Sequence, residues 1–363
     1  MTKEKHLTPE EWSEWKGKKG SRYISFRNST ASKEIVDMLL MYNRCTLDQL
    51  AIGMNKSRIT IQRAACRLEE GGYVKSGRAY GKKVIWLSKE TKKHYGVADQ
   101  PDDHISSDRK LMRGAKTSEV RMAFRVSEPV TQSKIREGFT DIKDIKQEVQ
   151  DIGLKLSRMY GLYVHGKKNY SVFNIGRGIN WQDGIEKKAR ALLIDEYVHE
   201  PLDTAIVFVD SMDAVTRMLT YSAEDRRDRQ TLMSTSKIYK EQLAFPLSRD
   251  GHDQLRLYRS LDEPRRQFAR AVLNDDEIDR HGSEVYDGVW KDDNKARTPT
   301  VVLFMCDIKR IDNILSLLRM GSIISLYIAC YDTQEEFYRE VFGDFPAVEI
   351  VPFAFRDVEK RLT

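Results

Sequence analysis

Three carboxylates in the C-terminal part of the chain could take part in metal chemistry. Asp210 and Asp307 each follow an apolar, strand-like run, Asp307 stands two residues before Lys309, and Glu186 lies on a predicted helix. Clustered carboxylates that hold a metal ion, with a lysine nearby, are what a metal-dependent nuclease needs. An aspartate at a strand end also caps the helix that follows. We favour the capping role and predict no catalytic residue.

The sequence offers no other pattern for metal or cofactor chemistry. It has no P-loop, GxGxxG, HExxH or GxSxG pattern, and its histidines lack metal-ligand spacing. Cys45, Cys66, Cys306 and Cys330 are widely separated, which is typical of buried or partly buried thiols in a reducing compartment. No apolar run is long enough to cross a membrane. We therefore predict no metal, no cofactor and no membrane partner, and we expect a cytoplasmic protein.

The most specific functional pattern is a predicted helix over residues 58–70, capped by Ser57. Ile61, Ala64, Ala65 and Leu68 recur at helical spacing, and the two alanines allow close approach to neighbouring helices. Gly71 and Gly72 end the helix, because glycine readily adopts the left-handed conformation after a last turn. Polar and cationic residues occupy the rest of the surface: Ser57, Arg58, Thr60, Gln62, Arg63 and Arg67.

The flanking elements would position this helix. A helix that starts at a Ser32 cap and a second that starts at a Thr46 cap come before it, with a turn at Asn55 and Lys56. Strands over 73–75 and 84–87 follow, joined by a basic tip. The tip residues expected to contact DNA are Arg78, Tyr80, Lys82 and Lys83. Three helices and a basic hairpin are the order of a winged helix-turn-helix, whose third helix enters the major groove of double-stranded DNA.

The run ITIQRAACRLEEGGYV, residues 59–74, is similar to the corresponding part of winged-helix regulators. It has a Thr-apolar-x-Arg stretch followed by Leu-x-x-x-Gly-Tyr and an apolar residue, and the hairpin follows in the expected place. The resemblance implies a winged helix that binds DNA.

Charge is unevenly divided along the chain. Residues 1–98 hold 20 Lys and Arg against 10 Asp and Glu, a net charge of +10, and since the whole chain carries +6, residues 99–363 carry −4. A basic N-terminal third indicates a module that binds a polyanion.

The C-terminal part is predicted to be a three-layer α/β domain. The runs TAIVFVDS, TVVLFMCD, SLYIACYD and VEIVPFAF are continuously apolar, which indicates strands buried on both faces, and helical stretches follow three of them. The chain divides into a basic and aromatic arm (1–28), the winged helix (29–97), a linker (98–110) and the α/β domain (111–363), with a charged insertion near 220–298.

The domain order and the stretch YSVFNIGRGINWQDGIE, residues 170–186, resemble the replication-relaxation proteins of plasmids and integrative elements. That resemblance implies a C-terminal domain related to restriction-endonuclease folds and a role at an element's origin. The segment 220–298 has no counterpart in the resemblance.

The favoured function is therefore sequence-specific DNA binding at a replication or transfer origin of a bacterial mobile element. The C-terminal domain would serve assembly or control, and we expect a homo-oligomer, since a symmetric dimer doubles the length of DNA that is read. Two alternatives stay open. One is a transcriptional repressor with a C-terminal dimerisation or sensor domain, and the other is a metal-dependent nuclease or nicking enzyme.

Overall fold

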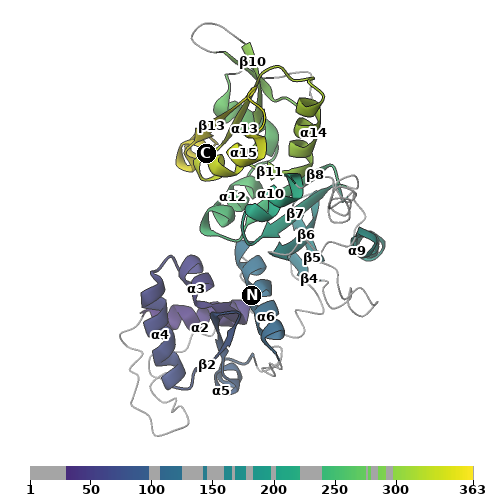
Figure 1. Cartoon of the computed structure of the whole chain (residues 1–363). Coiled ribbons are helices and arrows are strands. Elements are labelled where there is room, and N and C mark those ends of the chain that lie inside the picture. The colour runs from purple at the N-terminus through teal and green to yellow at the C-terminus, as the bar shows by residue number, and fades with distance from the viewer. Residues whose placement is uncertain are drawn as a thin grey trace. The chain divides into compact units, whose positions relative to one another are not determined.

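The computed structural model divides into two compact units, Met1–Ile142 and Lys143–Thr363 (Figure 1). The residues that it describes are 30–97, 107–124, 142–144, 159–165, 168–176, 183–197, 202–220, 239–274, 277–278, 285–291 and 297–362. The predicted arm over 1–28 lies outside them. Helices and paired strands alternate, and the predicted mixed α/β class is confirmed.

The first unit contains helices and one small sheet with strand order β1-β3-β2, antiparallel throughout. Its elements are α2 (Thr30–Tyr42), β1 (Arg44–Thr46), α3 (Leu47–Gly53), α4 (Arg58–Glu70), β2 (Val74–Ala79), β3 (Lys82–Leu87), α5 (Lys89–His94) and α6 (Asp108–Ala123).

Side-chain caps set the starts of α3 and α4, as predicted. Thr46 and Gln49 form a reciprocal capping box at α3, and the Ser57 hydroxyl accepts a hydrogen bond from the Thr60 N–H. The predicted Ser32 cap is wrong, because α2 already begins at Thr30 and Ser32 is buried inside the helix. Ser32 continues the stripe of Ile35 and other core residues at helical spacing, so its side chain faces inward.

The hairpin turn is tighter than the predicted tip. The strands extend to Ala79 and Lys82, which leaves a turn of only Tyr80 and Gly81, with φ of 50° and 76°. Positive φ at both central residues is the conformation of a type I′ turn, whose twist matches that of the paired strands.

Helix α6 belongs to the first unit, so the boundary predicted near residue 110 moves towards Ile142. Leu111 and Ala115 pack in one cluster with Trp86 of β3. The Gln49 side-chain amide donates to the Ala115 carbonyl at 3.0 Å, and the Ser118 hydroxyl donates to the Tyr42 carbonyl. The predicted linker over 98–110 overlaps the start of α6, and only the fold shows on which unit this helix packs.

The second unit contains two sheets. The six-stranded sheet has the order β11-β8-β7-β6-β5-β4, and the four-stranded sheet has the order β13-β12-β10-β9. The strands are β4 (Ile142–Asp144), β5 (Met159–His165), β6 (Lys168–Gly176), β7 (Thr204–Val209), β8 (Glu241–Pro246), β9 (Gly288–Lys291), β10 (Arg297–Val302), β11 (Cys306–Asp307), β12 (Leu326–Tyr331) and β13 (Val348–Phe353).

Both sheets follow one plan, in which an antiparallel hairpin is extended by two parallel strands. The hairpin β5-β6 is extended by β7 and β8, and the hairpin β9-β10 by β12 and β13. The helices are α9 (Asp183–Tyr197), α10 (Asp213–Thr220), α12 (Arg249–Arg259), α13 (Pro264–Val272), α14 (Ile308–Arg319), α15 (Glu335–Phe342) and α16 (Phe355–Leu362).

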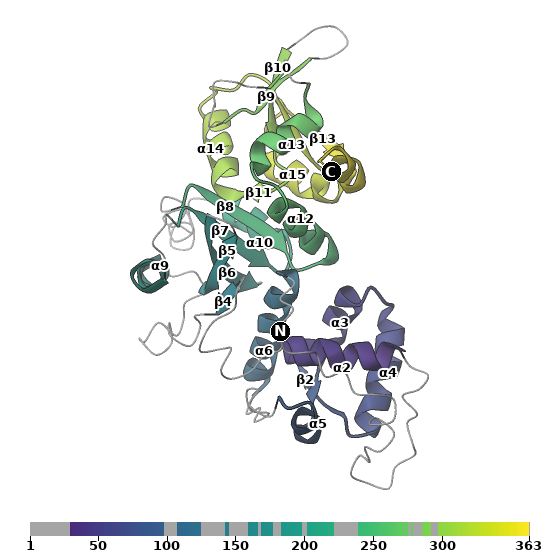
Figure 2. The same ribbon diagram turned by 180° about the vertical axis from the view of Figure 1, so that it is seen from behind.

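Two expectations for this unit need correction. The four apolar runs do not all lie in one sheet. β7 lies in the six-stranded sheet, β12 and β13 lie in the four-stranded sheet, and the run TVVLFMCD supplies β10 to the four-stranded sheet and β11 to the six-stranded sheet. The segment 220–298 is no simple charged insertion, because it supplies β8, which pairs with both β7 and β11. Its charges lie partly on α12, whose opposite face packs against β8 (Figure 2).

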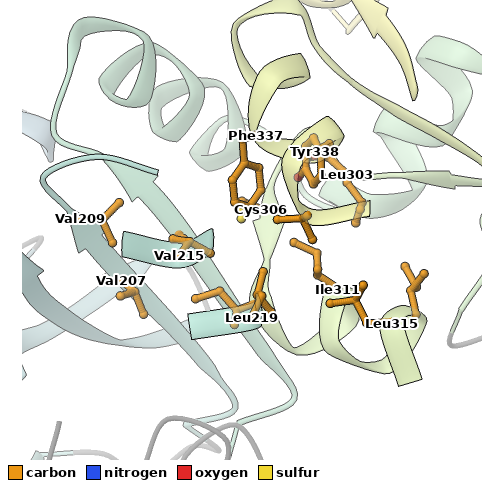
Figure 3. Packing of buried hydrophobic residues seen from close by; sticks show 14 of the residues in the cluster. Val207, Val209, Val215, Leu219, Leu303, Cys306, Ile311, Leu315, Phe337 and Tyr338 are labelled. Carbon is orange, nitrogen blue, oxygen red and sulfur yellow. The ribbon is translucent and has the colours of Figure 1, made fainter. Parts of the chain in front are cut away.

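One apolar core joins the two sheets. Side chains of β7, α10, α14 and α15 pack together with Leu303, which follows β10, and with Cys306 of β11 (Figure 3). They include Val207, Val209, Val215, Leu219, Leu303, Cys306, Ile311, Leu315, Phe337 and Tyr338. Because side chains from both sheets bury this surface together, the two halves of the unit share this core.

A buried ion pair ties the helices to this core. Asp287 Oδ2 lies 2.7 Å from Arg310 Nη2 on α14 and accepts a hydrogen bond of 2.7 Å from the Val302 N–H. The other carboxylate oxygen lies 2.7 Å from Arg265 Nε on α13. Only 3% of the Asp287 side chain and 8% of the Arg310 side chain are exposed, so water cannot replace a lost partner.

We predict that Asp287→Asn lowers the free energy of unfolding by about 3–5 kcal/mol, because it leaves two arginines beside a buried neutral group. The matched control is Glu335→Gln, which breaks the exposed pair between Arg339 and Glu335 and should cost less than about 0.5 kcal/mol. Urea unfolding of the full chain measures both. Equal effects of the two substitutions would contradict the assignment.

Candidate nucleic-acid interface

Helix α4 is held by its apolar side. Ile61, Ala64, Ala65 and Leu68 are buried, and α4 packs on α2 and α3. Alanine at two successive inner positions allows the helix axes to come close, because a longer side chain would separate them. The opposite side of α4 therefore faces outward in a fixed orientation.

The polar residues predicted to contact DNA lie on this outward side. Ser57, Arg58, Thr60, Gln62, Arg63 and Arg67 are all exposed. The Ser57 hydroxyl lies 2.8 Å from the Thr60 hydroxyl and also caps the helix. Arg58 Nε lies 2.8 Å from a carboxylate oxygen of Asp48 on α3, which orients the guanidinium plane beside the helix. Asp48 was not singled out from the sequence, since only the fold brings it to α4.

The β2-β3 hairpin presents a second group of polar residues. Arg78 and Lys82 are exposed beside the turn, and 70% of Tyr80 is accessible to solvent. Tyr80 adopts a positive φ of 50°, which is unfavourable for a bulky residue. A costly conformation that displays an aromatic ring at a loop tip is typical of a site with a functional role.

Lys83 differs from its neighbour Lys82 in the structure. Lys83 Nζ lies 2.7 Å from Glu69 Oε2 on α4, and the Ser76 hydroxyl donates to the other oxygen of Glu69 at 2.5 Å. Burial alone would raise the pKa of Glu69, but the hydrogen bonds from Lys83 and Ser76, with the Lys83 charge, hold this pKa below its usual value. The cluster links the hairpin to the last turn of α4.

Ile59 was not among the residues that the sequence predicted to contact DNA. This side chain is 64% exposed in the first turn of α4, between Arg58 and Thr60. The available signal was its phase, since Ile59 lies off the stripe formed by the other apolar residues of the helix.

The three carboxylates considered for metal binding lie on different parts of the six-stranded sheet. Asp307 on β11 pairs with Leu243 on β8. Asp210 follows the last residue of β7, and the register of β7 with β8 places it about 13 Å from Asp307 along the strand direction. Glu186 accepts a hydrogen bond from the Met159 N–H on β5, several strands away from Asp307. Within the described residues, no group of three or more metal-ligating side chains could hold a metal.

Asp307 is the cap of α14, as predicted. Its Oδ1 accepts from the backbone N–H groups of Lys309 and Arg310, and from the N–H of Gln242 on β8. Burial, followed by the negative charge of Glu241, raises the pKa of Asp307 from 3.8 to about 6. Lys309 Nζ donates a hydrogen bond of 3.1 Å to the Tyr239 carbonyl, so this lysine makes a structural contact.

The chain was compared with protein-family models, curated proteins and solved structures, and nothing matched. In the part of the chain that the structure describes, every helix is too short or too polar to cross a membrane.

The two adjacent lysines of the hairpin allow a matched test. Lys82→Ala should weaken binding to any duplex and lower the salt dependence of binding by roughly one released counterion, with unchanged stability. Lys83→Ala should cost stability on the order of 0.5–1 kcal/mol, because its partner Glu69 is only partly exposed. Titration of a labelled duplex at several salt concentrations, with thermal unfolding of both variants, separates the roles. Identical results for both lysines would refute the distinction.

Asp307→Asn should change how stability depends on pH. The folded pKa is raised, so the wild-type carboxyl stabilises the fold below about pH 4 and loses this contribution as pH rises through about 6. Asparagine keeps the Oδ1 acceptor and does not titrate. Between pH 4 and pH 7.5, the free energy of unfolding of the variant should therefore rise by about 2–3 kcal/mol relative to that of wild type. Urea unfolding at a series of pH values measures this difference. If the difference in free energy of unfolding between variant and wild type stays constant with pH, the raised pKa of Asp307 is contradicted.

Proposed function

We propose that the first unit is a winged helix-turn-helix module that binds double-stranded DNA. Helix α4 enters the major groove, and the β2-β3 hairpin contacts the adjacent backbone or minor groove. The observation that carries the proposal is the division of α4 into a fully buried apolar side and an exposed side with three arginines, Arg58, Arg63 and Arg67.

The charge of the unit supports a polyanionic partner. Residues 30–97 hold 13 Lys and Arg against 6 Asp and Glu, so the excess of positive charge does not depend on the N-terminal arm. Arg78, Lys82 and Tyr80 add two cations and an aromatic ring beyond the end of the recognition helix. Cations on both elements suit phosphates on the two sides of one groove.

For the second unit we propose assembly or control of the DNA-bound protein at an origin of a mobile element. The consecutive strand order from β4 to β8, with β5 antiparallel to β6, supports a relation to restriction-endonuclease folds. Neither β5 nor β6 contains an aspartate or glutamate, although adjacent strands of that fold usually hold the metal-binding carboxylates of a nuclease. A symmetric oligomer would place two α4 helices on one DNA site.

The outward face of α4 contains a thiol that can report on binding. All four cysteines lie within described residues, and Cys66 on α4 is the one that is not buried. A duplex selected from a random library should slow the alkylation of Cys66, because the major groove would cover it. Arg63→Ala should weaken binding of this duplex by about 1–3 kcal/mol, whereas Arg339→Ala on α15 should not.

Two results would overturn the proposal. One is unchanged alkylation of Cys66 at saturating duplex, and the other is equal affinity of wild type and Arg63→Ala for the selected site. Unfolded protein, in which all four cysteines react, provides the reference for complete alkylation.

A further inference from the structure

Ile59 occupies the centre of the outward face of α4. At 3.6 residues per turn, it points about 170° away from the mean direction of Ile61, Ala64, Ala65 and Leu68. These four residues are at most 3% exposed, whereas Ile59 is 64% exposed. No other residue of the first two turns of α4 points so directly away from the unit's core.

The surroundings of Ile59 indicate what could cover it. Its sequence neighbours are Arg58 and Thr60, and Arg63 lies one turn further along the same side. An apolar protein partner would need a contiguous apolar patch, which a single isoleucine among polar and cationic side chains does not form. A DNA duplex presents phosphates to the cations and, within the major groove, one apolar group on a base edge, the C5-methyl of thymine.

We propose that Ile59 reads a thymine by contact with its C5-methyl group, and that this thymine lies one or two base pairs from the base read by Arg63. The inference rests on the proposed DNA-binding function. Side chains four residues apart on a helix are separated by about 5–6 Å, which corresponds to one or two base steps. Arginine most often binds guanine in the major groove, at O6 and N7, so Ile59 and Arg63 together specify a thymine and a guanine within two base pairs of each other.

The test combines a protein variant with a change of a single DNA atom group. In a duplex selected from a random library, each thymine is replaced in turn by uracil, which lacks only the methyl. Wild-type affinity should fall roughly 3- to 10-fold at one thymine, or at its symmetry mate as well. For Ile59→Ala, thymine and uracil should bind equally at that position, while sensitivity to the neighbouring guanine is retained.

Ile324 supplies the matched control, since it is 90% exposed but lies in the second unit. Ile324→Ala should keep the full wild-type preference for thymine over uracil. If wild type binds the selected duplex but no uracil substitution matters, or if Ile59→Ala keeps the same preference, the role of Ile59 is refuted and the DNA-binding function stands. If no duplex is selected from the library, both the DNA-binding function and the role of Ile59 are refuted.

Discussion

The close packing of α4 against α2 and α3 is the constraint on which the first unit depends. Ala64 and Ala65 leave room for that approach, and Ile61 and Leu68 fill the space on either side of them. A helix buried on one side by apolar side chains has little freedom to rotate, because rotation would expose them to water. The direction of every outward side chain, including Arg63, follows from this packing.

The hairpin is oriented by polar contacts rather than by the core alone. Glu69 receives hydrogen bonds from Lys83 and Ser76, so one carboxylate joins the last turn of α4 to both strands of the hairpin. On the strand side, Trp86 packs with Leu111 of α6. Helix and hairpin thus hold a fixed relation, which a protein needs if a groove contact and a backbone contact are to be made together.

Two of the carboxylates that were considered for metal binding, Asp307 and Glu186, make structural contacts in the second unit, and so does Asp287. Asp307 caps α14, Glu186 accepts from a strand N–H, and Asp287 neutralises two arginines between α13 and α14. A buried carboxylate with its hydrogen bonds already made is a poor ligand for a metal, because binding would break those bonds.

Local patterns in the sequence determined α2, α3, α4 and the β2-β3 hairpin, the Thr46 and Ser57 caps and the outward arginines, because spacing and capping act over a few neighbouring residues. Only the tertiary structure decided that α6 packs on the first unit, that β8 lies inside a sheet, and that Lys83 pairs with Glu69. Each of these depends on residues far apart in the chain, whose meeting is selected by the burial of whole surfaces. Ile59 differs from these cases, because its position off the apolar stripe of α4 was already readable from local spacing, and the tertiary structure adds that this side chain is 64% exposed.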